Sequence, residues 1–126
     1  MKLRIKGNSL RLRVSRSDVA QLMQAGCVEE TIRFAPEPAA KLTYRLEHAA
    51  TPREISIHYS VQNIRVLLST EAAKRWADGD EVGIYGHVDT GTAPLELLVE
   101  KDYACIDGGG ADNADAFPNP KAGIVC

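Results

Sequence analysis

The sequence predicts an α+β fold in which one unit, strand-strand-helix-strand-strand, occurs twice. Three observations predict it: apolar and polar residues alternate in short runs, two stretches have helical periodicity, and the apolar pattern recurs after 54 positions. Under that shift, the apolar positions Leu10, Leu12, Val14, Val19, Leu22 and Val28 meet Ile64, Val66, Leu68, Ala73, Trp76 and Val82. With a one-residue deletion, Leu42, Tyr44 and Leu46 then meet Leu95, Leu97 and Val99.

The 126 residues are enough for one ordinary domain with its own core. We assign residues 1–104 to a single duplicated domain, with halves at about 1–48 and 54–102. Residues 105–126 are rich in Gly, Asp and Pro and contain too few apolar residues for a core of their own, so they are interpreted as a C-terminal tail.

In the first half, strands are predicted at 2–6 and 10–14, which form a hairpin about the Gly-Asn-Ser turn at 7–9. Ser15 caps the following helix, with Asp18 in its first turn, and Gly26 suits the left-handed residue that ends it. Strands are then predicted at 28–34 and 41–47, although Glu30 falls on the apolar face of the first.

The second half repeats this order. Strands are predicted at 55–59 and 64–68, Ser69 caps a helix that ends at Asp78-Gly79-Asp80, and strands follow at 82–88 and 95–99. Strands joined by short turns are antiparallel, so about eight antiparallel strands result. We expect them to close into a barrel, which removes exposed edges. The alternative is two sheets packed face to face, with a helix at each end.

Composition restricts the possible partners. The formal net charge is −2, so a global basic field for nucleic acid is missing and a nucleic-acid partner is not expected. Arg4 and Lys6 interrupt the N-terminal apolar residues, and no run approaches the length of a membrane span, so we expect no membrane partner. The same two features predict a cytoplasmic location, and the odd, widely spaced Cys27, Cys105 and Cys126 favour reduced thiols.

The sequence contains no recognisable catalytic constellation, so neither catalytic residues, metal ligands nor cofactors are assigned. The three histidines do not stand at metal-ligand spacing, although His58 and His87 both fall on polar strand faces and could meet in the fold. Cys105 is flanked by Asp102 and Asp107, which oppose formation of a reactive thiolate.

The polar faces of the strands carry many charges, which predicts either a solvated sheet face or a binding surface. Guanidinium and ammonium groups that converge would hold a phosphate or a carboxylate. The candidate residues of such an anion site are Arg4, Lys6, Arg11, Arg13, Arg45 and Arg65.

We therefore predict a non-catalytic domain that binds either a small ligand, such as an anion, or a protein. The alternative is a hydrolase of phosphorylated substrates with a charged barrel interior, in which these arginines share one cavity with Glu47, Glu96 or Glu100. This charged barrel resembles the triphosphate tunnel enzymes, but only in architecture. Those enzymes open with alternating glutamates, whereas this chain opens Lys2-Leu3-Arg4-Ile5-Lys6.

Four segments, KLRIKGNSLRLR, VEETIRF, VEKDYAC and AFPNP, are distributed along the chain between residues 2 and 120. In these the chain resembles a family of small uncharacterised bacterial proteins, a domain of unknown function, and the resemblance implies no activity. If the barrel is not closed, its unpaired strand edges make a homodimer possible through strand addition.

Overall fold

The computed structural model describes residues 1–103 and 115–118. These contain ten elements, arranged as two strands, a helix and two strands in each half. In chain order they are β1 (Lys2–Lys6), β2 (Ser9–Val14), α1 (Arg16–Ala25), β3 (Cys27–Arg33), β4 (Lys41–Ala49), β5 (Ile55–Ser60), β6 (Asn63–Ser69), α2 (Thr70–Asp78), β7 (Gly83–Asp89) and β8 (Pro94–Lys101).

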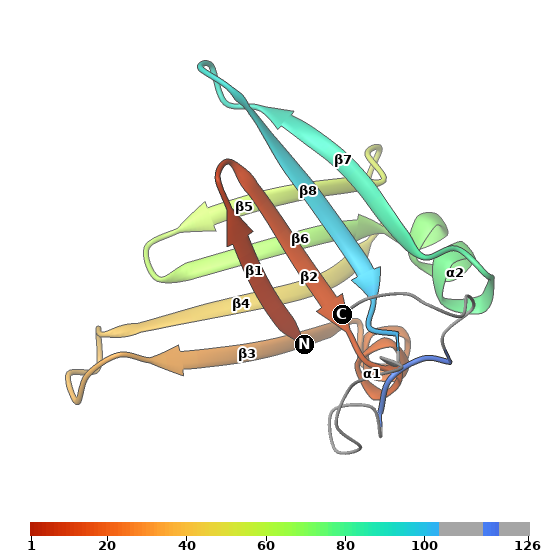
Figure 1. Cartoon of the computed structure of the whole chain (residues 1–126), viewed down its shortest axis with the longest axis horizontal. Helices are drawn as coiled ribbons and strands as arrows, with labels where there is room; N and C mark the ends of the chain where they lie inside the picture. The colour runs from red at the N-terminus through yellow and green to blue at the C-terminus, as the bar shows by residue number, and fades with distance from the viewer. Residues whose placement is uncertain (104–114, 119–126) are drawn as a thin grey trace.

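The strands form two packed four-stranded sheets, not a barrel (Figure 1). Sheet A has the order β1-β2-β8-β7, and sheet B has the order β3-β4-β6-β5. The expectation of a closed barrel is therefore wrong, and the α+β fold with two packed sheets is confirmed. The strands joined by short turns are antiparallel as expected, but β2 pairs with β8, and β4 with β6, in parallel, so the sheets are mixed and not wholly antiparallel.

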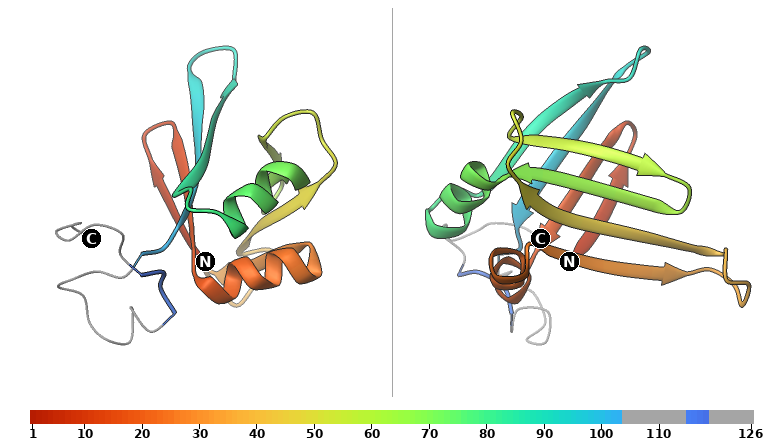
Figure 2. Two further views of the ribbon diagram at one scale, coloured as in Figure 1. Left: turned by 90° about the vertical axis from the view of Figure 1, so that its right-hand side faces the viewer. Right: turned by 180° about the vertical axis from the view of Figure 1, so that it is seen from behind.

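The predicted helix signals are confirmed. Ser15 and Asp18 form a reciprocal capping box at the start of α1, and Gly26 ends it in the left-handed conformation with φ of 88°. Ser69 accepts a hydrogen bond from the Ala72 amide at the start of α2. The two helices lie side by side at one end of the sheets and not at opposite ends (Figure 2).

Each helix carries the chain from one sheet to the other, so each sheet contains one hairpin from each half. The apolar faces of both sheets and of both helices meet in a single core, and the polar faces point outward. The core consists of Leu10, Leu12, Val14, Val19, Leu22, Val28, Leu46, Ile55, Val66, Leu68, Ala72, Ala73, Trp76, Ile84, Leu97 and Val99.

Strand registers in the two sheets correspond closely. Lys2 opposite Arg13 in β1/β2 corresponds, 54 positions later, to Ser56 opposite Leu67 in β5/β6. The parallel pair Leu10 and Leu97 likewise corresponds to Ile64 and Tyr44. Equivalent positions of β1, β2 and β5, β6 are thus 54 apart, and those of β4 and β8 are 53 apart.

The third strands of the two halves, β3 and β7, are related by a different number of positions along the sequence. Val28 pairs with Leu46, and the equivalent pair in sheet A is Ile84 and Val99. Val28 and Ile84 are 4% and 2% exposed, whereas Val82 is 43% exposed and precedes β7. The predicted match of Val28 with Val82 is therefore wrong, because the connection after α2 is longer than the one after α1.

Residues 115–118 lie against α1 and the end of β8. The Phe117 amide donates to the carbonyl of Asp102 at 2.8 Å, and the Phe117 ring centroid lies 5.9 Å from that of Tyr103. The Arg16 amide, in the first turn of α1, donates to the carbonyl of Asp115 at 3.1 Å. The predictions for Cys105 and Cys126 concern positions outside the described residues.

Candidate functional site

The six candidate cations are divided between two surfaces. Arg4, Lys6, Arg11 and Arg13 lie on the outer face of sheet A, on β1 and β2, whereas Arg45 and Arg65 lie on the outer face of sheet B. Because the inner faces pack together, the outer faces point away from each other. The predicted single chamber is therefore wrong, and with it the charged barrel interior of the hydrolase alternative.

On sheet B the two arginines are fully engaged with carboxylates. Arg45 lies 3.1 Å from Glu29 and 3.0 Å from Glu47, whose other oxygen lies 3.0 Å from Arg65. Burial opposes the charge of Arg45, but its hydrogen bonds to Glu29 and Glu47 outweigh burial and raise its pKa. These four side chains cross β3, β4 and β6 beside a hollow of about 520 Å³. The positive charges of the two arginines are balanced by the negative charges of Glu29 and Glu47.

On sheet A the cations face one another across the hairpin. In the β1/β2 register, Lys2 is opposite Arg13 and Arg4 is opposite Arg11. Like charges directly opposite each other destabilise a strand pair. The first pair is compensated by Asp102, which lies 3.1 Å from Lys2 and 3.2 Å from Arg13.

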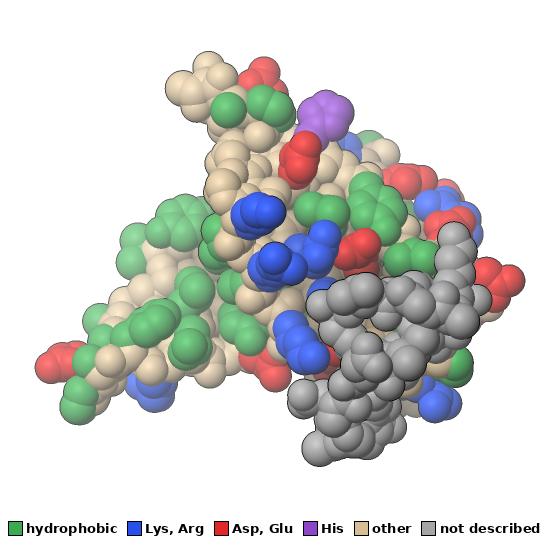
Figure 3. Space-filling view, viewed as in Figure 1, with side chains coloured by type: hydrophobic (Ala, Val, Ile, Leu, Met, Phe, Trp, Pro, Cys, Tyr) green, Lys and Arg blue, Asp and Glu red, His purple; other side chains and the backbone are tan. Residues whose placement is uncertain are grey.

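The second pair is compensated only in part. Arg11 lies 3.0 Å from Glu100, but within the described part of the chain no carboxylate comes within ion-pair distance of Arg4 or Lys6. Arg4, Lys6 and Arg11 line a hollow of about 170 Å³ together with Ser9, Glu96 and Leu98. Figure 3 shows the basic side chains gathered at the centre of this face, over β1 and β2. We call Arg4, Lys6 and Arg11 the β1/β2 cationic site.

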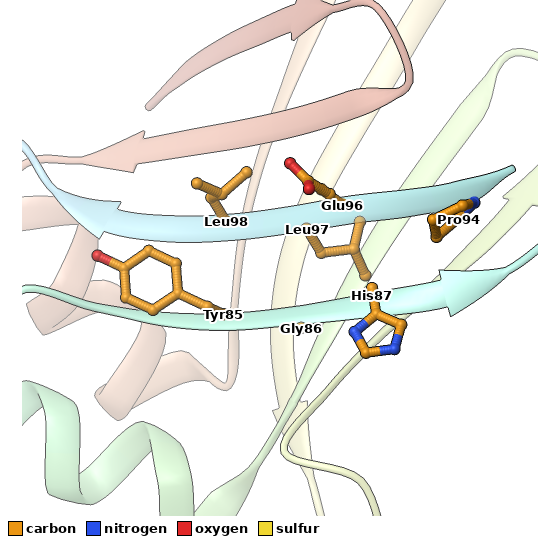
Figure 4. A pocket seen from close by; sticks show the side chains of 7 residues that line it. All are labelled: Tyr85, Gly86, His87, Pro94, Glu96, Leu97 and Leu98. Carbon is orange, nitrogen blue, oxygen red and sulfur yellow. The ribbon is translucent and has the colours of Figure 1, made fainter.

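A second, larger hollow of about 610 Å³ adjoins this site across β8. Glu96 and Leu98 line both hollows, and Tyr85, Gly86, His87, Pro94 and Leu97 complete the second one (Figure 4). The Glu96 side chain is directed toward β2, whereas the His87 ring is directed away from it, so the two do not form an acid–base pair (Figure 4). The outer face of sheet A thus joins a cationic patch to an apolar one.

Tyr85 closes the far end of the larger hollow. Its hydroxyl donates to Glu100 at 2.9 Å. Burial, followed by this hydrogen bond and the charge of Glu100, raises the pKa of Tyr85 to about 12. Tyr85 therefore stays neutral at physiological pH and serves as a hydrogen-bond donor.

The histidines do not meet. His58 lies on the outer face of sheet B beside Arg65, and His87 lies on the outer face of sheet A, so the sandwich separates them. His48 faces α2, where its Nδ1 lies 3.0 Å from the Thr70 hydroxyl. Among residues 1–103 and 115–118, His, Cys, Asp and Glu form no group of three that could hold a metal ion.

Comparison with known proteins places the chain in a family. Residues 1–121 match the model of a family of unknown function, DUF7009. The chain belongs to this family. Membership in DUF7009 assigns no reaction or ligand. Neither the curated proteins nor the solved structures contain a match to the chain. In the described part of the structure, no helix is long and apolar enough to span a membrane.

Sequence analysis identified the cations but not their apolar neighbours. The pairs Arg11–Glu100 and Arg65–Glu47 lie within the expected set of arginines and glutamates. Leu98 and Tyr85 were missed, because the parallel pairing of β2 with β8 brings together residues far apart in the chain. The apolar Leu98 on the otherwise polar face of β8 was the one available signal.

Proposed function

We propose that this protein is a non-catalytic binding domain that holds a small phosphate or carboxylate ligand at the β1/β2 cationic site. The observation that carries the proposal is the uncompensated charge of Arg4 and Lys6. Lys2, Arg11, Arg13, Arg45 and Arg65 have carboxylate partners at 3.0–3.2 Å, and Arg4 and Lys6 have none among the described residues. Arg33 and Lys41, opposite each other at the hairpin end of sheet B, lack one as well, but they do not line the hollow beside Arg45, whereas Arg4 and Lys6 line a hollow of their own.

Cross-strand repulsion supports this interpretation. Arg4 and Arg11 are directly opposite each other, and such a pair lowers stability unless an anion bridges it. A phosphate or carboxylate would accept charge-assisted hydrogen bonds from both guanidinium groups and would relieve the repulsion. The uncompensated positive charge of the β1/β2 hairpin therefore favours an anionic ligand.

The adjoining hollow narrows the class of ligand. Leu98 forms part of the wall of both hollows, and Tyr85 adds an aromatic ring to the larger one. An anion that carries an apolar group would place its charge at Arg4 and Arg11 and its apolar part against Leu98 and Tyr85. Burial of that part would add affinity in proportion to the apolar area removed from water.

Calorimetric titration with inorganic phosphate, acetate and phenyl phosphate at low ionic strength tests the proposal. We expect phenyl phosphate to bind more tightly than inorganic phosphate. Replacing Arg4 by Gln should weaken binding about tenfold to a hundredfold, because one charge-assisted hydrogen bond is worth about 1.5–3 kcal/mol. The matched control is Arg53→Gln, which removes the same charge from an exposed loop.

A second reading of the same charges predicts a different outcome. Cations on an edge strand such as β1 also oppose pairing with other sheets, and this role needs no ligand. Under that reading no anion binds, or Arg4→Gln and Arg53→Gln weaken binding equally. Either result would refute the proposed site.

We also propose that the two halves arose by internal duplication. The equivalent registers of the two sheets and the matching N-cap serines Ser15 and Ser69 support it. A cytoplasmic location stays a prediction from the sequence.

A further inference from the structure

Strand β3 is an edge of sheet B, and from Glu29 onward the residues on both of its faces are exposed. Every residue from Glu29 to Arg33 is exposed, and only Val28 is buried. Ile32 and the adjacent Phe34 are 48% and 67% exposed on the inner side of the sheet. Apolar side chains gather over the hairpin ends of sheet B, where sheet A does not cover them (Figure 3).

The free backbone groups of this edge can be identified. The Phe34 amide donates to the Ala40 carbonyl, and the His48 amide donates to the carbonyl of Gly26. Even-numbered residues of β3 therefore bond to β4, and by the alternation of an antiparallel ladder the odd-numbered ones face outward. Glu29, Thr31 and Arg33 thus present their N–H and C=O groups at the edge.

We propose that two copies of this chain associate through β3, paired antiparallel about a twofold axis at Thr31. In this register Glu29 of each copy lies opposite Arg33 of the second copy, twice in the dimer. Thr31 lies opposite Thr31, and Val28 lies opposite Phe34. All three odd-numbered residues then exchange hydrogen bonds, and sheet B becomes one continuous eight-stranded sheet across the dimer.

The charges select this register over its neighbours. Pairing about Glu29, Glu30 or Arg33 places two identical charges directly opposite each other, which is destabilising. Pairing about Ile32 creates no opposite-charge pair. Only the register about Thr31 opposes Glu29 and Arg33, and Arg33 has no ion-pair partner among the described residues of its own chain.

The other sheet edges are poor candidates. Lys2, Arg4 and Lys6 share one face of β1, so antiparallel self-pairing about Arg4 would place like charges opposite each other at every outer position. The edges β5 and β7 approach each other within the chain, and a Cβ at Gly86 would overlap the Cγ2 of Ile55. Edge β3 therefore remains for a second copy.

Antiparallel pairing also explains the uncovered apolar residues. Ile32 and Phe34 lie at the end of β3 far from the helices. The second copy would run in the opposite direction, so its covered end, with its own sheet A, would lie beside this uncovered end. The exposed apolar side chains would then be adjacent to the partner and removed from water.

Sedimentation equilibrium at submillimolar concentration tests the proposal. The unmodified chain should form dimers, and Arg33→Glu should weaken dimerisation roughly tenfold or more, because both opposite-charge pairs become like-charge pairs. Glu29→Arg should do the same. A mixture of the two variants should restore dimers, since each Glu then faces an Arg. Lys74→Glu, an exposed change on α2, is the control and should have no effect.

A disulfide crosslink tests where the twofold axis of the dimer lies. In a chain with Cys27, Cys105 and Cys126 changed to Ser, Thr31→Cys should form a disulfide-linked dimer on oxidation, because Cα atoms of a hydrogen-bonded pair are about 5.5 Å apart. Arg33→Cys in the same background should not. A monomer throughout, or a dimer that ignores the charge changes and fails to crosslink at Thr31, would overturn the proposal.

Discussion

The outer faces of sheets A and B share a scaffold but differ in charge balance. At equivalent positions each has one arginine–glutamate pair at 3.0 Å, Arg11–Glu100 on sheet A and Arg65–Glu47 on sheet B. Sheet B adds Arg45, which bridges Glu47 and Glu29, whereas sheet A has the apolar Leu98 at the position equivalent to Arg45.

This difference distinguishes cations that are paired with carboxylates within the fold from cations that remain available to an anionic ligand. On sheet B the cations Arg45 and Arg65 each have a carboxylate and form a balanced network, whereas Arg33 and Lys41 at the hairpin end have none among the described residues. On sheet A the position equivalent to His58 is Arg4, which adds a charge without a partner among the described residues. We infer that the pseudo-equivalent scaffold supports a closed network on one side and an open cationic site on the other.

Core substitutions should affect both sheets alike. Leu46 and Leu97, in the central strands β4 and β8, are both fully buried in the shared core. Replacing either by Ala should lower the free energy of unfolding by about 2–5 kcal/mol, measured by urea denaturation. A loss confined to one of the two variants would contradict a common core.

The contact between β5 and β7 should also be sensitive. Gly86 lies where a Cβ would overlap Ile55, so Gly86→Ala should destabilise the fold by about 1–3 kcal/mol. Ile55→Ala removes the overlapping group, so Gly86→Ala should cost less in that background. Equal costs in both backgrounds, in a double-mutant cycle, would show that the two edges are not in contact.

The outer faces should respond in opposite directions to loss of charge. Glu47→Gln removes the carboxylate that holds two arginines, and we expect a loss of about 1 kcal/mol. Arg4→Gln should raise the stability of the ligand-free protein by a few tenths of a kcal/mol, because it relieves repulsion with Arg11. Both effects should shrink in high salt. Destabilisation by Arg4→Gln would mean that this charge is structural.

The smallest effect concerns pH and Tyr85. Because its pKa is raised from 10 to about 12 in the folded protein, the folded state retains this proton more strongly than the unfolded chain. Its contribution to stability is complete below pH 10 and is lost as pH rises through 12. Tyr85→Phe should therefore flatten the fall in unfolding free energy over that interval. An unchanged pH profile would contradict the hydrogen bond to Glu100.

Local structure was predictable because its signals are local. Alternation between 2 and 14 located β1 and β2, and Ser15, Asp18 and Gly26 located both ends of α1. Glu30 broke the predicted apolar face of β3, and the structure explains it: its exposed carboxylate lies 3.3 Å from the Met1 amino group and accepts a hydrogen bond from Tyr44.

Strand neighbours were not predictable from alternation. The period of two tells which side chains share a face, but it does not tell which strand lies alongside. The closed barrel and the wholly antiparallel pairing were wrong for this reason, and so was the single chamber for Arg4, Arg11, Arg45 and Arg65. Each helix moves the chain to the opposite sheet, and this step divides the cations between two faces.

The amino-acid sequence by itself determined the elements, their caps and the sorting of each strand into an apolar and a polar side, because these depend on neighbours along the chain. Tertiary structure alone decided that Leu98 and Glu96 stand beside Arg11, and that β3 is left without a neighbour on one side. Both outcomes depend on pairing between distant segments, whose free energy comes from burying the two apolar faces in one core.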